Sequence, residues 1–171
     1  VPYLCPRGQS IGRWFPLAAI AGRADIMAHF DKAKVGADGF AMQVGTLSGN
    51  PVASVAGLKT MEILRRPGVY DAMADKGRAL MSTYAEALGA KGIAHQVVGE
   101  PWLFDCVFAR AAVQDYRAVL RSDMGLAKTF NASMRQSGIL KSDAKIYAHA
   151  ALTETDMDQI QTAIHTAAKT L

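Results

Sequence analysis

The chain has 171 residues, of which 50% are hydrophobic and 20% charged, as in a globular protein with a sizeable core. Its 19 basic and 15 acidic residues give a formal net charge of +4, but they are interspersed without a block of like charge, which argues against nucleic-acid binding. The apolar stretches are short and interrupted by Arg23 and Asp25, so no membrane-spanning segment is expected.

The two cysteines, Cys5 and Cys106, have no second Cys or His at metal-ligand spacing. Neither a disulfide framework nor a metal site is therefore expected, and reduced thiols favour a cytoplasmic location. The chain starts at Val1 without an initiator Met or a signal-peptide pattern, which is consistent with a start within a longer protein.

The first part of the chain predicts short elements. Residues 1–16 are rich in Gly, Pro and Arg and predict irregular backbone, whereas the apolar residues 17–21 predict a short buried strand. A short helix is expected over 24–30. Two glycines and an aspartate predict a loop over 32–40.

Two helices are expected in the middle of the chain. Asn50 can cap the first helix and Pro51 fits its first turn, and apolar residues recur at helical spacing as far as Leu64. After a break at 65–68, residues 69–88 predict a long amphipathic helix that ends near Gly89.

The second half mixes strands and helices. Residues 94–98 and 103–108 predict paired strands, 116–134 a helix and 146–152 a third strand. A capping-box pattern that starts at Thr153 predicts the last helix. This order indicates a small α+β arrangement.

The segment Gly45-Thr46-Leu47-Ser48-Gly49-Asn50-Pro51 has two glycines and two hydroxyls directly before a capped helix. Free N–H groups, the positive end of the helix dipole and a Thr hydroxyl suit a phosphate dianion. By composition alone, plain helix capping is the commoner explanation of such residues.

Together with the helix that follows it, this segment resembles the class III aminotransferases, particularly those similar to glutamate-1-semialdehyde aminomutase. Phe15-Pro16-Leu17-Ala18-Ala19-Ile20-Ala21-Gly22-Arg23 is similar to the strand after the family's active-site lysine loop, and residues 69–81 and 138–158 are similar to its small domain. The resemblance covers nearly the whole chain. It implies an α/β fold: the end of a fold type I large domain over 1–68, then a small C-terminal α+β domain over 69–171.

The resemblance also implies site residues. Gly45 and Thr46 would contact the phosphate of pyridoxal 5′-phosphate across a homodimer interface, while an amino acid or amine is the substrate class of the parent enzyme. Gly8, Ile11 and Gly12 match the lysine loop, but Gln9 stands at the Schiff-base lysine, and Arg13 and Trp14 replace two glycines. A carboxamide cannot act as amine, base or acid, so a fragment that is inactive alone is expected.

A competing hypothesis is a noncatalytic protein that dimerises or binds a phosphorylated ligand on the same scaffold. A third is that helices such as 52–64 expose apolar surface that a missing N-terminal half would cover.

Other polar residues are weaker candidates for a functional site. We interpret the four histidines, His29, His95, His149 and His165, and the lysines Lys32 and Lys34 as structural or surface residues. Glu100 with Asp105 could form a carboxylate pair, and Arg110, Arg117 and Arg121 could hold a substrate carboxylate, but solvent-facing roles are commoner for both sets.

Overall fold

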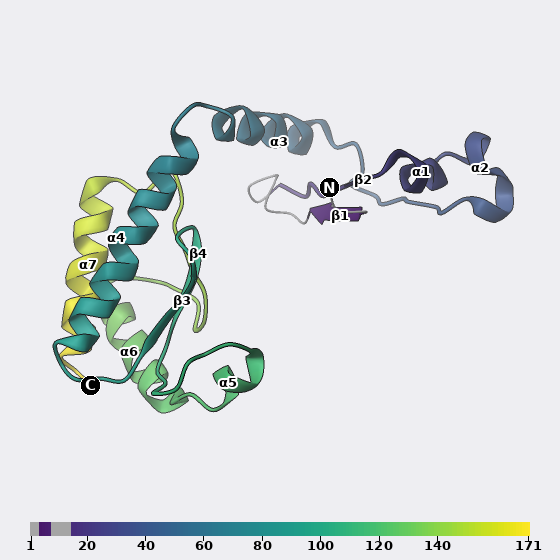
Figure 1. The fold of residues 1–171 in the computed structure, drawn as a ribbon. Coiled ribbons are helices and arrows are strands. Elements are labelled where there is room, and N and C mark those ends of the chain that lie inside the picture. Colours follow the sequence, from purple (N-terminus) through teal and green to yellow (C-terminus); the bar gives the residue numbers. More distant parts are fainter. Residues whose placement is uncertain (1–3, 8–14) are drawn as a thin grey trace. The chain divides into compact units, whose positions relative to one another are not determined.

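A computed structural model describes residues 4–7 and 15–171 of the chain (Figure 1). The contacts divide the chain into two compact units, Val1–Pro67 and Gly68–Leu171. The junction is a turn in which Gly68 adopts a φ of 78°, a left-handed conformation that glycine takes without the strain of a side chain. The assignment of 1–68 and 69–171 to the end of a large cofactor domain and a small C-terminal domain stays a prediction.

The N-terminal unit starts with a two-stranded antiparallel ribbon, in which β1 (Leu4–Arg7) pairs with β2 (Ala19–Gly22). The prediction of irregular backbone was therefore wrong at β1, because a pairing between distant residues leaves no trace in composition. The predicted strand is confirmed at β2. Its burial is not, since Ala19, Ile20 and Ala21 are exposed and a two-stranded ribbon has no interior of its own.

Short helical turns follow the ribbon: α1 (Ala24–Met27), the 3-10 turn η2 (Ala28–Phe30) and α2 (Lys32–Gly39). The short helix predicted over 24–30 is confirmed, whereas the loop predicted over 32–40 was wrong. The Asp31 side chain accepts a hydrogen bond from the Ala33 N–H at 3.1 Å and starts α2. Gly36, with a φ of 75°, then kinks it into two turns.

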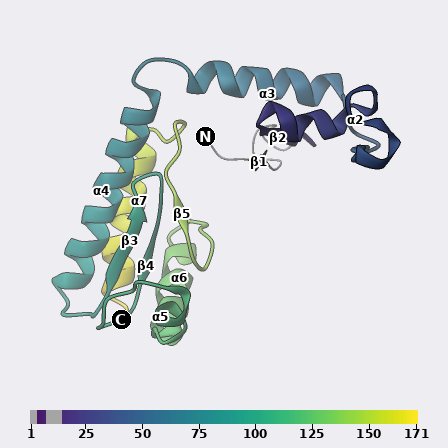
Figure 2. The same cartoon turned by 45° about the vertical axis from the view of Figure 1, so that its right-hand side comes forward.

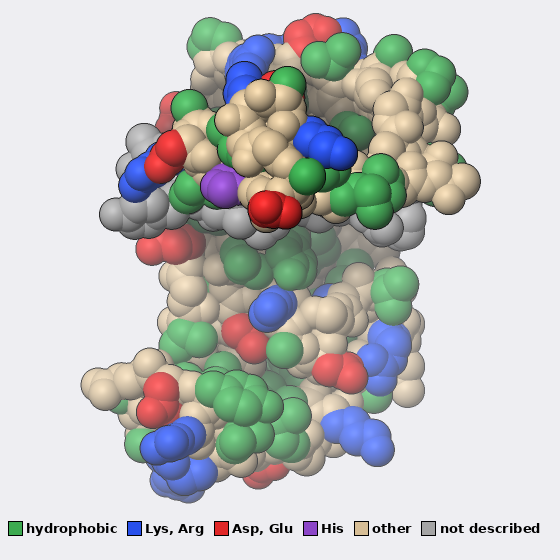
Figure 3. Space-filling model, turned by 90° about the vertical axis from the view of Figure 1, so that its right-hand side faces the viewer, with side chains coloured by type: hydrophobic (Ala, Val, Ile, Leu, Met, Phe, Trp, Pro, Cys, Tyr) green, Lys and Arg blue, Asp and Glu red, His purple; other side chains and the backbone are tan. Residues whose placement is uncertain are grey.

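Helix α3 (Pro51–Leu64) starts as predicted, with the Asn50 side chain accepting a hydrogen bond from the Ala53 N–H at 3.0 Å. Its large apolar side chains are not buried, since Val55 is 66% and Leu58 72% exposed. The buried residues of this helix are the small Ala53 and Gly57. Figure 3 shows hydrophobic side chains that reach the surface on one face.

The C-terminal unit combines helices with one antiparallel sheet of strand order β3-β4-β5. Its elements are α4 (Val69–Gly89), β3 (Gln96–Glu100), β4 (Leu103–Val107), α5 (Tyr116–Leu120), α6 (Met124–Gln136), β5 (Ile146–Tyr147) and α7 (Glu154–Ala168). The predicted long helix, hairpin and capping box are confirmed.

Two predictions for this unit were wrong in extent. The helix over 116–134 is two helices, because the Asp123 side chain accepts a hydrogen bond from the Leu126 N–H at 2.9 Å and begins a new helix, α6. The strand over 146–152 is only the two residues of β5, which pair with Leu103 and Phe104.

The core of the C-terminal unit lies among α4, α6, α7 and the sheet, with α4 and α7 side by side (Figure 2). Tyr84 packs against Phe104 and Phe130 at ring-centroid distances of 6.1 and 5.6 Å. The largest fully buried side chains are Tyr84, Phe104, Phe130, Leu88, Met134 and Ile164. Because aromatic pairs favour such edge and tilted contacts, this cluster gives the unit a well-packed centre.

Candidate functional site

The loop from Gly45 to Gly49 is a tight turn that leads directly into α3. The Ser48 N–H donates to the Gly45 carbonyl at 2.9 Å, and the Asn50 N–H donates to the Leu47 carbonyl at 3.1 Å. Gly49 has a φ of 73°, which a side chain would strain. Backbone bonds and the Asn50 cap therefore set this loop at the N-terminus of the helix.

The loop borders a cavity of about 850 Å³ within the N-terminal unit. The apolar wall comes from β2, the short helices and the segment directly before the loop. The described residues that line the cavity are Pro16, Leu17, Ala18, Ile20, Met27, Phe30, Phe40, Met42, Gln43, Val44, Gly45, Thr46, Leu47, Ser48 and Gly49. Both predicted phosphate contacts, Gly45 and Thr46, thus lie on one rim of one cavity.

Hydrogen-bond donors are available on this rim. The Thr46 hydroxyl and the N–H groups of Gly45 and Thr46 are exposed and donate no hydrogen bond to another described residue. A Cβ at Gly45 would lie 3.1 Å from the Ser48 Oγ, so a side chain there would crowd the turn. Uncommitted donors beside a helix N-terminus fit a phosphate group.

Gln9 lies outside the described residues, as do Gly8, Ile11, Gly12, Arg13 and Trp14. Its place relative to the cavity at Thr46 therefore stays a prediction. The strand predicted by resemblance to follow the lysine loop overlaps β2, and Ile20 of β2 lines that cavity.

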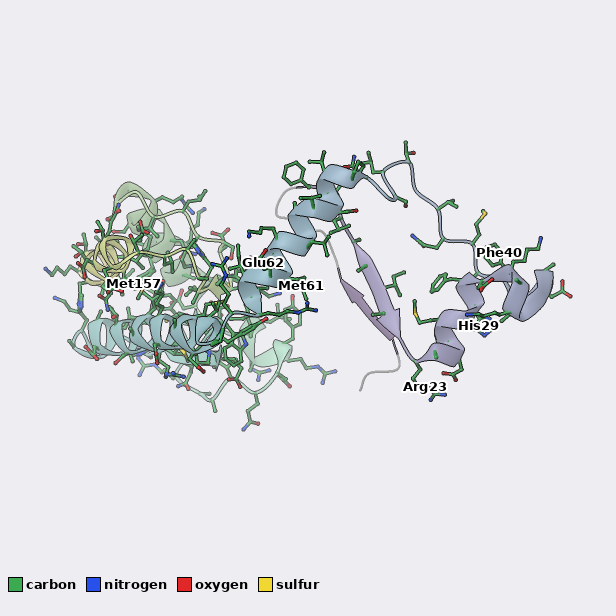
Figure 4. The ribbon with its side chains drawn as sticks, turned by 90° about the horizontal axis from the view of Figure 1, so that it is seen from above. Arg23, His29, Phe40, Met61, Glu62 and Met157 are labelled. Atoms are coloured by element: carbon green, nitrogen blue, oxygen red, sulfur yellow. The ribbon has the colours of Figure 1, made fainter. Side chains whose placement is uncertain are left out.

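The histidines make local contacts or lie at the surface. The Nδ1 atom of His29 lies 2.7 Å from the carbonyl of Gly39, the last residue of α2, and Phe40 follows it (Figure 4). The Nδ1 atom of His95 lies 2.8 Å from the Ile93 carbonyl. His149 and His165 are exposed. Lys34 pairs with Asp31 at 3.6 Å on an exposed surface. These contacts agree with the structural interpretation of such residues.

The structure brings together only some of the residues in the two weaker candidate sites, the three arginines and the pair of acids. Arg110 and Arg121 line a cavity of about 430 Å³ in the C-terminal unit together with Asp123, whereas Arg117 does not line it. Glu100 ends β3 and is exposed, while the charged neighbours of Asp105 are Lys141 and Lys145. A paired-carboxylate site is therefore not formed by these two acids.

Asp105 on β4 and Lys141 are half-buried charged neighbours, with the exposed Lys145 as a third, and the sequence did not reveal this group. Burial raises the pKa of the Asp105 carboxyl, against the opposing effect of the Cys106 N–H and of two lysines. Burial lowers the pKa of the Lys141 ammonium, while Asp105 opposes that shift. The pKa of the Cys106 thiol is raised by burial to about 12, so this free thiol is a poor nucleophile.

The described ranges contain neither a candidate metal site nor a membrane-spanning helix. Residues 4–7 and 15–171 contain no group of three or more His, Cys, Asp or Glu side chains placed to hold a metal ion. In the same ranges, no helix combines the length and apolar character needed to cross a membrane.

Comparisons with known proteins agree on one family, although no family model matches the sequence. A glutamate-1-semialdehyde 2,1-aminomutase of Neisseria meningitidis serogroup C is 37% identical over 139 residues, which are 81% of this chain and 31% of that protein. An omega-transaminase from Sphaerobacter thermophilus matches 99% of this chain and 39% of its own, with a TM-score of 0.84 and 25% identity. A β-phenylalanine aminotransferase from Variovorax paradoxus matches 95% and 37%, with a TM-score of 0.82 and 26% identity.

The chain spans between about 31% and 39% of the length of these relatives. The matched fold is the corresponding part of a fold type I transaminase, with mixed helix and sheet content. The chain belongs to the class III, pyridoxal-phosphate-dependent aminotransferase family and corresponds to the C-terminal portion of its members.

Proposed function

We propose that this chain supplies the phosphate-anchoring part of a pyridoxal 5′-phosphate site in an enzyme that transfers or moves an amino group. The observation that carries the proposal is the turn at Gly45 and Thr46, whose unpaired donors line a cavity at the start of α3. When bound, the cofactor supplies electron-withdrawing chemistry at the substrate carbon that no side chain provides.

The role of Thr46 is to donate its hydroxyl to a phosphate oxygen, while Gly45 lets the backbone approach the same group. No Lys or Arg occurs among the described residues that line this cavity, so neutral donors and the helix dipole would hold the anion. Further groups in the complete site would come from a second copy of the chain, as a homodimer, or from the remainder of a longer protein.

Gln9 limits what the chain can do alone. Its amide nitrogen is delocalised into the carbonyl and has no protonation equilibrium near neutral pH, so it can neither bond covalently to an aldehyde nor move a proton. We infer that the chain by itself does not turn over an amino acid or amine, and that the family's activity belongs to a longer or lysine-bearing protein, located in the cytoplasm.

The first test adds pyridoxal 5′-phosphate to the chain and to Gln9→Lys, and measures binding from the visible spectrum and by calorimetry. After borohydride reduction, mass spectrometry locates any covalent adduct. We expect reversible binding by the original chain and labelling of residue 9 only in Gln9→Lys. Absence of binding to both proteins would contradict the proposal.

Thr46→Val tests the anchor itself. A lost hydrogen bond to a charged group costs about 1.5–3 kcal/mol, so affinity for pyridoxal 5′-phosphate should fall about tenfold or more. Thr162→Val, at an exposed position of α7, is the matched control and should bind as the original chain does. Unchanged affinity in Thr46→Val would remove Thr46 from the site. Binding without any adduct in Gln9→Lys would favour the noncatalytic phosphate-binding hypothesis.

A further inference from the structure

A second cavity, of about 440 Å³, lies within the C-terminal unit, and no residue of the phosphate-anchoring loop is among its described lining. One wall is apolar and comes from α4, α6 and α7, including Leu80, Met134 and Ile160. The other wall is the loop that joins α6 to β5, from Gly138 to Lys145. Concave sites of this size with an apolar body and a few polar groups are typical of small-molecule sites.

The polar wall carries two lysines. Lys141 is partly buried, and its Nζ donates to the Ser142 carbonyl at 2.7 Å. Lys145 has a φ of 56°, the one positive value among the described non-glycine residues. The Ser142 hydroxyl donates to the Lys145 carbonyl at 2.7 Å and holds this turn. Such strained conformations persist where surrounding contacts impose them, and they often occur at ligand sites.

The acidic groups nearby are already engaged. Asp156 lines the same cavity, but its Oδ2 accepts hydrogen bonds from the N–H and hydroxyl of Thr153 at 2.8 and 2.7 Å. Asp143 lies 3.7 Å from Arg135. Asp105 is the charged neighbour of both lysines but is not part of the lining. The described lining therefore carries two lysines against one aspartate, Asp156, and is positive on balance.

We propose that this cavity binds a small amphipathic carboxylate, with the apolar part against α4 and α7 and the carboxylate at Lys141 and Lys145. A partly buried ammonium gains from an anion, since a charge-assisted hydrogen bond in such a place is stronger than in water. The apolar wall, which includes Tyr84, favours a ligand with an apolar part over a purely inorganic anion. The proposal does not depend on the phosphate-binding role of Thr46.

The test titrates the ¹⁵N-labelled 171-residue chain with 3-phenylpropionate and follows amide chemical shifts. We expect saturable shifts at Gly138, Ile139, Lys141 and Gln159, and none at the loop around Thr46. The neutral analogue 3-phenylpropionamide should bind about tenfold more weakly or worse, since it lacks the charge. Equal affinity for acid and amide would overturn the proposal, as would shifts centred outside this cavity.

Lys141→Met keeps the length of the side chain and removes its charge, so 3-phenylpropionate should bind it about tenfold more weakly. Lys128→Met, at an exposed position of α6 that does not line the cavity, is the matched control and should bind unchanged. Equal affinity in the original chain and in folded Lys141→Met would contradict the role of Lys141. Inorganic phosphate should give no comparable shifts, and saturation by phosphate alone would overturn the carboxylate assignment.

Discussion

Gly77 marks the closest approach of α4 to the turn that joins β3 and β4. A Cβ built at Gly77 would lie 1.8 Å from the Pro101 carbonyl oxygen, and backbone atoms cannot move aside as a flexible side chain can. The glycine is therefore required by packing, although its place inside a helix reduces the intrinsic stability of that helix. The sequence shows only a glycine within a helical pattern, because the turn that it meets lies more than twenty residues away.

We expect Gly77→Ala to lower the free energy of unfolding by about 3 kcal/mol, as overpacking against rigid neighbours does. The measurement is urea unfolding followed by circular dichroism. Gly89→Ala in the same helix is the control, since nothing lies within 4 Å of its added Cβ, and it should stabilise by about 0.5 kcal/mol. Equal changes in unfolding free energy for the two substitutions would show that helix propensity, and not the contact with Pro101, determines the effect of a side chain at position 77.

Among the elements, α7 has the most complete start. The Thr153 hydroxyl accepts from the Asp156 N–H at 3.2 Å, and the Asp156 carboxylate accepts from the Thr153 N–H at 2.8 Å. These bonds satisfy two donors that every helix start leaves unpaired. The helix then buries Met157, Ala163, Ile164, Ala167 and Ala168 against the rest of the unit.

Thr153→Ala should therefore cost about 1 kcal/mol of unfolding free energy, the usual value for the loss of an N-cap side chain. Chemical denaturation of the 171-residue chain measures it. Thr162→Ala, in the exposed middle of the same helix, removes a hydroxyl without touching the cap and should leave stability unchanged or slightly higher. A loss at Thr162 as large as that at Thr153 would argue against the cap as the cause.

At the scale of the whole molecule, the described core cluster lies in the C-terminal unit. Its buried members run from Leu80 on α4 to Ala168 on α7, and they include Phe104 on β4 and Phe130 on α6. In the N-terminal unit, large apolar side chains such as Val44 and Leu58 are 72% exposed. The described core cluster therefore belongs to the C-terminal unit, whereas the loop that we propose to bind phosphate belongs to the N-terminal unit.

A fragment of residues 68–171 should accordingly fold alone and unfold cooperatively, at a urea midpoint close to that of the main transition of the full chain. Leu88→Ala, at a fully buried position, should lower the stability of both proteins by about 3 kcal/mol. Loss of cooperative unfolding in the fragment would mean that residues 1–67 are needed for the fold of the C-terminal unit.

Features that depend on near neighbours along the chain could be predicted from the sequence. Two helix starts were predicted correctly, from Asn50 before Pro51 and from the capping-box pattern at Thr153. The periodicity of 69–88 likewise predicted the long helix, because capping and amphipathicity act within a few residues. The turn at Gly45 and Thr46 was also visible as a pattern of glycines and hydroxyls before a helix.

Tertiary contacts decided what local patterns could not. The pairing of β1 with β2, the new helix start at Asp123 beside Phe108, and the burial of Ala53 in place of Val55 all depend on residues distant in sequence or on where an apolar face finds cover. The cavity beside Lys141 likewise exists only because the loop after α6 closes over α4 and α7. Such contacts form between segments that are distant in the sequence, and single-residue propensities contain no information about them.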